Sequence, residues 1–90
     1  MKDCLHIIVK GRVQGVYFRA YTQKQAVKLN LSGFVRNLSD GSVEIVASGH
    51  PDDLQKLVAW CHKGPLLAKV AELVVNAHQP DEHWQAFEIR

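Results

Sequence analysis

The stretch Gly11–Arg19, which reads GRVQGVYFR, combines residue types that bind anions. Its glycines allow the backbone to curl so that successive N–H groups point at one oxyanion. The stretch leads into a predicted helix, whose first turn carries unpaired N–H groups and a partial positive charge. Arg19 adds a planar fork of donors that suits bidentate binding of phosphate oxygens. We therefore predict a loop that binds phosphate, sulfate or carboxylate.

The predicted anion-binding loop consists of Gln14, Gly15, Val16, Tyr17, Phe18 and Arg19. Within it we expect the side chains of Gln14 and Tyr17 to pack the loop rather than take part in chemistry. Arg12 allows two interpretations, because an arginine beside such a loop either steers anionic ligands or is a simple surface residue.

Hydrophobic periodicity predicts the elements around this loop. A strand is expected over Cys4–Lys10, where apolar residues alternate, and a helix from Phe18 to about Asn30. One face of that helix carries Phe18, Thr22, Ala26 and Leu29. A strand over Leu31–Leu38, the turn signal Asp40-Gly41 and a strand from Val43 to Ser48 predict a hairpin.

The second half of the chain repeats this alternation. Pro51 and two aspartates mark a helix start, and Gly64-Pro65 marks its end. The expected inward face of this helix carries Leu54, Leu57, Val58 and Cys61. A fourth strand over Lys69–Val75, a polar loop over Asn76–Trp84 and a short fifth strand over Phe87–Arg90 follow. The order predicts an α+β, ferredoxin-like split βαββαβ sandwich, with two helices on one face of an antiparallel sheet.

Composition restricts the function classes. The 90 residues, 47% of them hydrophobic, suffice for one domain over 1–90 and not for a second one. The net charge of +2 is too small and too scattered for a nucleic-acid-binding surface. No apolar run approaches membrane-spanning length and no signal sequence is apparent, so we expect a cytoplasmic protein without a membrane partner.

The potential metal ligands and thiols do not form a recognisable site. The histidines lack metal-ligand spacing, and we predict neither a metal nor another cofactor; they are His6, His50, His62, His78 and His83. Cys4 and Cys61 also lack a short metal-binding spacing. Buried reduced thiols are favoured over a disulfide between them.

Two long patterns resemble those of the acylphosphatases, small cytosolic enzymes with the same order of elements. The family pattern G-x-V-Q-G-V-x-F-R is met by residues 11–19. A second pattern, G-[FWY]-V-x-N-x-x-D-G-x-V-E, is met by Gly33–Glu44, and a later G-P-x-x-A-x-V is met by Gly64–Val70. The resemblance spans nearly the whole chain, and two such patterns at this separation are much more specific than one glycine-rich loop.

This resemblance implies a function and two catalytic residues. Arg19 would bind the phosphate and Asn37 would hold the attacking water. The expected reaction is the metal-independent hydrolysis of the carboxyl-phosphate anhydride of a small acyl phosphate, with inorganic phosphate or sulfate as an inhibitor. We expect the enzyme to act as a monomer.

Two other functions are compatible with the same architecture. An RNA-recognition module would carry aromatic residues on its central strands, whereas the strand Ser42–Ala47 is acidic and contains none. A non-catalytic sensor of small anions is the stronger alternative, and turnover of an acyl phosphate would distinguish it from an enzyme.

Overall fold

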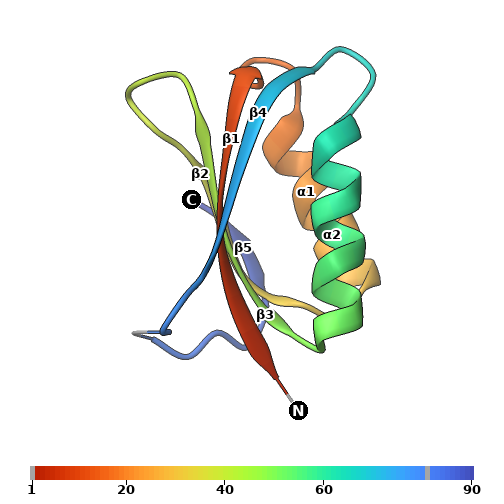
Figure 1. The fold of residues 1–90 in the computed structure, drawn as a ribbon, viewed down its shortest axis with the longest axis vertical. Coiled ribbons are helices and arrows are strands. Elements are labelled where there is room, and N and C mark those ends of the chain that lie inside the picture. Colours follow the sequence, from red (N-terminus) through yellow and green to blue (C-terminus); the bar gives the residue numbers. More distant parts are fainter. Residues whose placement is uncertain (1, 81) are drawn as a thin grey trace.

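The computed structural model describes residues 2–80 and 82–90, which form one sheet and two helices (Figure 1). Both helices cover the same face of the sheet, and the other face carries no helix. The elements in chain order are β1 (Asp3–Arg12), α1 (Phe18–Lys28), β2 (Ser32–Asn37), β3 (Val43–Gly49), α2 (Pro51–Lys63), β4 (Lys69–Ala77) and β5 (Phe87–Ile89).

The strand order is β4-β1-β3-β2-β5, and one pairing departs from the predicted antiparallel sheet. The pairs β1–β3, β1–β4 and β2–β3 are antiparallel, as predicted. In contrast, β5 pairs in parallel with β2, so the sheet is mixed. The chain passes from β4 at one edge to β5 at the other, and this long crossing lets β5 run in the direction of β2. The predicted ferredoxin-like arrangement with two helices is confirmed, and so is the predicted hairpin.

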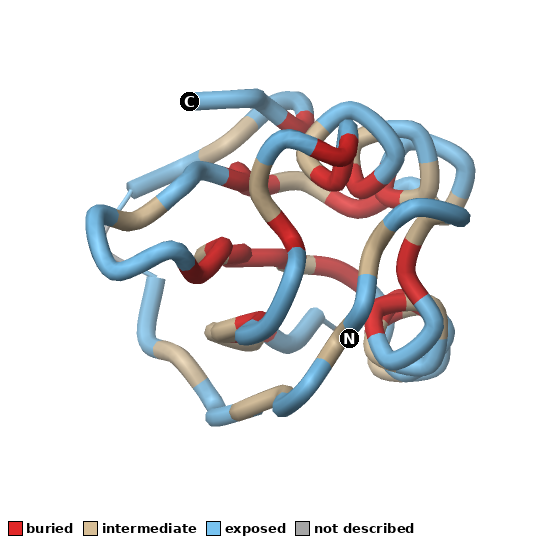
Figure 2. The backbone as a smooth tube through the Cα atoms, turned by 90° about the horizontal axis from the view of Figure 1, so that it is seen from above, coloured by how far each residue is buried: buried red, intermediate tan, exposed pale blue. Residues whose placement is uncertain are grey.

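The main core lies between the sheet and the helices, and Figure 2 shows the buried stretches gathered in the interior of the molecule. Phe18, Thr22 and Ala26 of α1 are buried, as the predicted helix face requires. Leu54, Leu57 and Cys61 are the buried residues of α2. These side chains pack on the core-facing residues of the central strands, which include Ile7, Val9, Val35, Val43 and Ile45.

A second, smaller cluster lies on the sheet face without helices. Cys4, Phe34 and Val46 are buried there, and Trp84 packs against them. The rings of Phe34 and Trp84 meet edge to face, with centroids 6.1 Å apart. Trp84 comes from the predicted polar loop over Asn76–Trp84; β4 occupies its first two residues, and Asp81 lies outside the described residues. The segment after β4 therefore covers part of this face.

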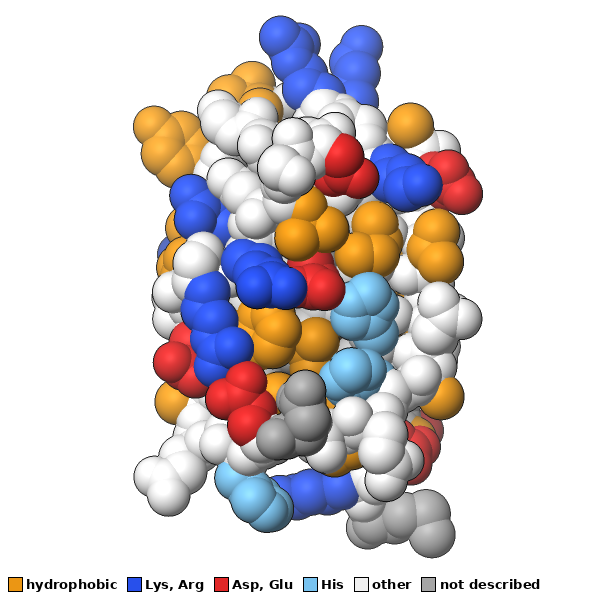
Figure 3. All heavy atoms as spheres, turned by 90° about the vertical axis from the view of Figure 1, so that its left-hand side faces the viewer, with side chains coloured by type: hydrophobic (Ala, Val, Ile, Leu, Met, Phe, Trp, Pro, Cys, Tyr) orange, Lys and Arg blue, Asp and Glu red, His pale blue; other side chains and the backbone are white. Residues whose placement is uncertain are grey.

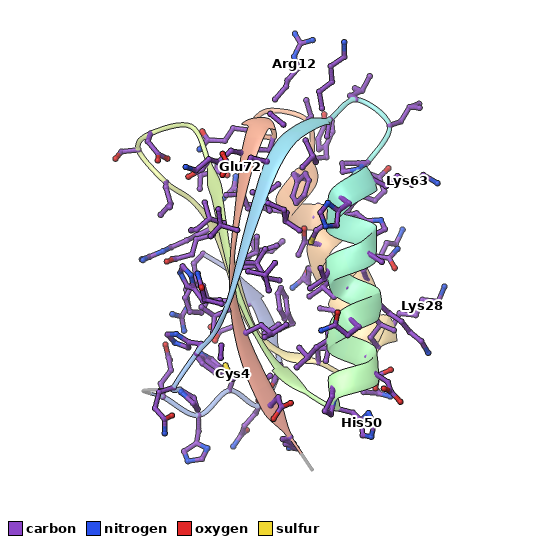
Figure 4. All side chains as sticks on the ribbon, in the orientation of Figure 1. Cys4, Arg12, Lys28, His50, Lys63 and Glu72 are labelled. Carbon is purple, nitrogen blue, oxygen red and sulfur yellow. The ribbon has the colours of Figure 1, made fainter. Side chains whose placement is uncertain are left out.

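The two thiols belong to different clusters. Cys4 lies on the face without helices, as Figure 4 shows, whereas Cys61 is fully buried in the main core. A disulfide between them is excluded because the sheet separates them. Burial raises the pKa of Cys61 to about 12, so its side chain remains a neutral core thiol.

Gly11 allows β1 to bend before the predicted anion-binding loop. The register between β1 and β4 shifts between Lys10 and Gly11, which marks a β-bulge. Gly11 has φ of 126°, and a Cβ there would stand 2.2 Å from the carbonyl oxygen of Lys69. The bulge therefore requires glycine, and it leads the chain out of the sheet toward α1.

Candidate active site

The loop between β1 and α1 is fixed to the core by two valines. Val13 and Val16 are buried, whereas Gly15 and Tyr17 are exposed. These two side chains thus anchor the backbone, while Gly15 and Tyr17 remain at the surface. The loop is positioned by core packing, which gives its N–H groups fixed directions.

Two residues of this loop have left-handed backbone conformations. Gly15 has φ of 76° and Tyr17 has φ of 64°. Left-handed residues within a loop turn neighbouring N–H groups toward a common centre, which is the geometry of an anion-binding nest. Tyr17 is also the N-cap residue of α1, so the loop leads directly into the first helical turn.

The start of α1 faces the same region. Its first helical hydrogen bond runs from the Tyr21 N–H to the Tyr17 carbonyl oxygen, over 3.1 Å. The N–H groups of Phe18 and Arg19 precede that bond and have no earlier helical turn to bond to. Phe18 fixes this helix end, because its buried ring packs on Trp60 with centroids 5.4 Å apart.

Gln14 joins the loop to the β2–β3 hairpin. Its Nε2 donates to the carbonyl oxygens of Leu38 and Ser42, each over 2.8 Å. The hairpin turn itself is held by the Asp40 carboxylate, which accepts from the Ser42 N–H over 3.0 Å. Hydrogen bonds from the Ser42 side chain and backbone lower the pKa of Asp40. Gln14 therefore has the expected packing role, because its side chain holds the loop against the end of β2.

A cleft of about 340 Å³ brings the predicted catalytic residues together. Arg19 and Asn37, which are 18 positions apart in the sequence, both line it. Of the other predicted loop residues, Gly15, Tyr17 and Phe18 line the cleft, whereas Gln14 and Val16 do not. The full lining is Val13, Gly15, Tyr17, Phe18, Arg19, Ala20, Asn37 and Ile89.

The edge strand β5 supports Arg19. The Nη1 of Arg19 donates to the carbonyl oxygen of Arg90 over 3.2 Å, and the Arg90 N–H donates to the Val35 carbonyl oxygen over 2.8 Å. A second link joins α1 to β5, because Gln23 Nε2 donates to the Phe87 carbonyl oxygen over 2.9 Å. The guanidinium is therefore oriented by the residue that directly follows β5, the strand that pairs with β2.

Asn37 is the last residue of β2, where the chain enters the hairpin turn. It pairs with Val43 of β3 and is exposed. The parallel register of β5 reaches Val35 and Ile89, so Asn37 lies just beyond this pairing, next to the C-terminal end of β5. An amide side chain at this position offers a donor and an acceptor to the cleft.

Sequence reasoning missed Ala20, Ile89 and the Arg90 carbonyl oxygen as parts of this region. Ala20 could have been found, because it follows Arg19 in the first turn of the predicted helix. No local signal marks Ile89 or Arg90, since their place depends on the parallel pairing of β5. Arg12 is exposed and projects from the end of the sheet (Figure 4), and it does not line the cleft.

A charged cluster lies on the sheet face without helices, away from the cleft, where Figure 3 shows two histidines beside an acidic side chain. The Glu44 carboxylate pairs with His6 Nε2 at 2.8 Å and with Arg36 Nε, and the His6 and His78 ring centroids are 5.7 Å apart. Burial raises the pKa of Glu44, but hydrogen bonds from His6 and Arg36 outweigh it, so the net pKa is lowered. Among the described residues, no three His, Cys, Asp or Glu side chains are grouped to hold a metal ion.

Comparison with known proteins identifies the family. The Acylphosphatase family model matches residues 5–89. An acylphosphatase of Marinobacter nauticus is 56% identical over 71 residues, which cover 79% of this chain and 77% of that protein. An acylphosphatase of Vibrio cholerae is 42% identical over 88 residues, covering 98% and 97% of the two chains. The crystal structure of acylphosphatase from Bacillus subtilis has a TM-score of 0.93 at 40% identity, covering 100% of this chain and 99% of that one. The chain belongs to the acylphosphatase family.

Proposed function

We propose that this hydrolase of acyl phosphates binds the phosphoryl group with Arg19 and the loop amides of Gly15–Arg19, and orients the attacking water with Asn37. The acyl phosphate activity follows from the family; the roles of individual residues are the proposal. One observation carries these roles: Arg19, Asn37 and the exposed part of the loop line the same cleft.

The chemistry explains why these few groups suffice. Hydrolysis of an acyl phosphate releases a carboxylate, which is a weak base and leaves without being protonated. A general acid is therefore unnecessary. What remains is to neutralise and orient the phosphoryl group and to place water in line with the breaking bond. A guanidinium fork and converging N–H groups perform the first task.

Asn37 performs the second task without changing its charge. Its side chain offers a donor and an acceptor, and its oxygen accepts a hydrogen bond from the attacking water. The proton released by the attacking water passes to a phosphoryl oxygen of the substrate. The reaction then yields one carboxylate and one inorganic phosphate.

The decisive experiment is the hydrolysis of acetyl phosphate by the purified protein in the presence of a chelator. We expect full activity, because a carboxylate leaving group needs no Lewis acid. Activity that disappears with chelator and returns with a divalent ion would contradict the metal-free reaction. Alkyl phosphate monoesters are the matched control, and we expect them to be poor substrates because their alkoxide leaving group requires protonation.

Inhibition, assembly and location complete the proposal. Inorganic phosphate and sulfate are expected to compete with substrate, since both fit a cradle of N–H groups. Action as a monomer stays a prediction from the sequence. A cytoplasmic location is part of the same proposal, because the sheet between Cys4 and Cys61 excludes a disulfide that joins them, as expected in a reducing compartment. No described helix is long and apolar enough to cross a membrane.

A further inference from the structure

Arg90, the residue that directly follows β5, connects the candidate active site with the sheet face without helices. Its carbonyl oxygen accepts a hydrogen bond from Arg19 Nη1 over 3.2 Å. Its guanidinium reaches the face without helices, where the Arg90 Cζ lies 4.3 Å from the centroid of the Phe34 ring. One residue therefore contacts the proposed phosphate ligand with its backbone and the far side of the sheet with its side chain.

Two carboxylates hold the guanidinium of Arg90. Its Nη1 and Nη2 donate to the two oxygens of Glu82, each over 3.0 Å, which is a bidentate arrangement. Its Nη2 also donates to Glu88 over 3.3 Å. The hydrogen bond from Arg90 lowers the pKa of Glu82, so the pair stays charged at neutral pH. The Arg90 and Glu82 side chains are 34% and 42% exposed, and at such exposure bidentate geometry is what makes an ion pair effective.

The Phe34 ring adds a cation–π contact that depends on these carboxylates. A second guanidinium, that of Arg36, lies 5.6 Å from the same ring centroid and is paired with Glu44. Two positive groups therefore share one aromatic ring, and acidic partners compensate their repulsion. Because Glu82 is the bidentate partner, we expect Arg90 to leave the Phe34 ring when this carboxylate is removed.

The backbone around Arg90 has little other support. The strand β5 has three residues, lies at the edge of the sheet and pairs with β2 alone. The Arg90 N–H donates to the Val35 carbonyl oxygen over 2.8 Å, which extends this pairing by one bond. Short edge strands open more easily than central ones. The side-chain contacts of Arg90 therefore help to keep its carbonyl oxygen in place for Arg19.

We propose that Glu82 is a positioning residue for Arg19 and that it acts through Arg90. Glu82 does not line the cleft. Its carboxylate fixes the Arg90 side chain, and the Arg90 carbonyl oxygen then holds one N–H group of Arg19, so that the remaining donors keep their direction. The proposal rests on the function proposed above, because it takes Arg19 as the phosphate ligand.

The kinetic test compares Glu82→Ala with the wild type, with acetyl phosphate as substrate and inorganic phosphate as inhibitor. We expect kcat/KM to fall and the inhibition constant of phosphate to rise, each about 3- to 10-fold, since a displaced donor costs less than a deleted one. Glu72→Ala is the matched control at an exposed glutamate of β4, and it is expected to change neither quantity. Wild-type values for Glu82→Ala would overturn the proposal.

A second variant tests whether Glu82 acts through Arg90. Arg90→Lys keeps the backbone carbonyl group and the positive charge but loses the bidentate fork, so we expect a similar loss. The double variant Glu82→Ala/Arg90→Lys is expected to lose no more than the larger of the two single losses, because both changes remove the same contact. Losses that multiply would show independent effects and would overturn the proposal.

A spectroscopic measurement separates positioning from a general structural role. The side-chain N–H resonances of Arg19 are identified by NMR as those that disappear in Arg19→Lys. We expect these resonances to shift and to exchange faster with water in Glu82→Ala, and to stay unchanged in Glu72→Ala. A loss of activity in Glu82→Ala with unchanged Arg19 resonances would overturn the positioning role.

Failure of this proposal is distinguishable from failure of the proposed function. Wild-type turnover in Arg19→Lys would overturn the phosphate-binding role of Arg19, on which both proposals depend. A large loss in Arg19→Lys together with wild-type kinetics in Glu82→Ala would overturn the role of Glu82 alone and leave the proposed function standing.

Discussion

Arg19 is the residue on which phosphoryl binding depends most in the proposed reaction. Its guanidinium has one N–H group directed at the Arg90 carbonyl oxygen, which orients the remaining donors of the fork. Lysine would preserve the positive charge and lose both this orientation and bidentate binding.

We therefore predict that Arg19→Lys loses most turnover while the protein stays folded. A lost preorganised donor corresponds to about 3 kcal/mol in the barrier, which is a fall of at least about 100-fold in kcat. Steady-state kinetics with acetyl phosphate and the circular dichroism spectrum of the variant check this. Turnover near the wild-type value would remove Arg19 from the site.

Asn37 is expected to act on the water and not on the phosphate. We predict that Asn37→Ala loses at least about 100-fold in turnover while it retains most of its affinity for inorganic phosphate. Calorimetric titration with phosphate and kinetics on the same preparation measure the two quantities. A parallel collapse of both, in a folded protein, would instead make Asn37 a phosphate ligand or a support for the loop.

At the scale of elements, the link between the anion-binding loop and the β2–β3 hairpin depends on Gln14. The carbonyl oxygens that it contacts also accept backbone bonds within the hairpin, from the Leu38 N–H and the Gly41 N–H. Each oxygen therefore still accepts one hydrogen bond when the Gln14 amide is lost. The free energy of unfolding should fall by about the value of two ordinary hydrogen bonds.

We predict that Gln14→Ala lowers the free energy of unfolding by about 1–2 kcal/mol and weakens phosphate binding, because the loop loses its link to the hairpin. Urea denaturation and phosphate inhibition measure the two effects. The control is Gln55→Ala at an exposed position of α2, for which we expect neither effect. Unchanged phosphate inhibition in Gln14→Ala would show that core packing of Val13 and Val16 alone fixes the loop.

The Glu44 carboxylate on the sheet face without helices should make the stability of the protein depend on pH. Glu44 has a pKa below its ordinary value of 4.5 in the folded protein, so its hydrogen bond with His6 and its ion pair with Arg36 stabilise the protein above that pH. The stabilisation is lost as the pH falls below about 4.5 toward the folded pKa. The groups facing this carboxylate are His6 and Arg36, with the His78 ring beside His6.

We predict that Glu44→Gln is less stable than the wild type at pH 7 and that the difference shrinks as the pH falls below about 4.5. Denaturant unfolding at neutral and acidic pH checks the sign. Glu72→Gln, at an exposed residue of β4, is the matched control. A stability difference that is the same at both pH values would show that the charge of Glu44 contributes nothing to stability.

At the scale of the whole molecule, the sequence predicts local features better than distant pairings. The hairpin followed from Asp40-Gly41 between two alternating segments, and the buried face of α2 followed from its regular spacing. The parallel pairing of β5 was not predictable, because no local pattern states which edge of the sheet a three-residue strand joins. The same pairing places Ile89 in the cleft and Arg90 beside Arg19, so these contacts were missed as well.

The exposed apolar residues of α1 and its N-cap were also beyond sequence reasoning. The buried side chains of this helix are few, and its apolar residues lie on both its inner and its outer face, so periodicity separates the faces poorly. Only the structure shows that Tyr17, Tyr21 and Val27 share an exposed surface. Arg19 and Asn37 were identified because two long patterns marked them, not because their proximity could be inferred.

The strand order has a consequence for how fast the protein folds. Among the described strands, only β2 and β3 are neighbours both in the sequence and in the sheet, whereas β1 pairs with two strands that follow much later. Closing these long loops costs chain entropy before the pairings repay it. The hairpin can form within microseconds, but assembly of the central strands should take milliseconds to seconds. Stopped-flow refolding is therefore expected to show a slow main phase, and Asn37, at the end of the hairpin strand, meets Arg19 only when that phase is complete.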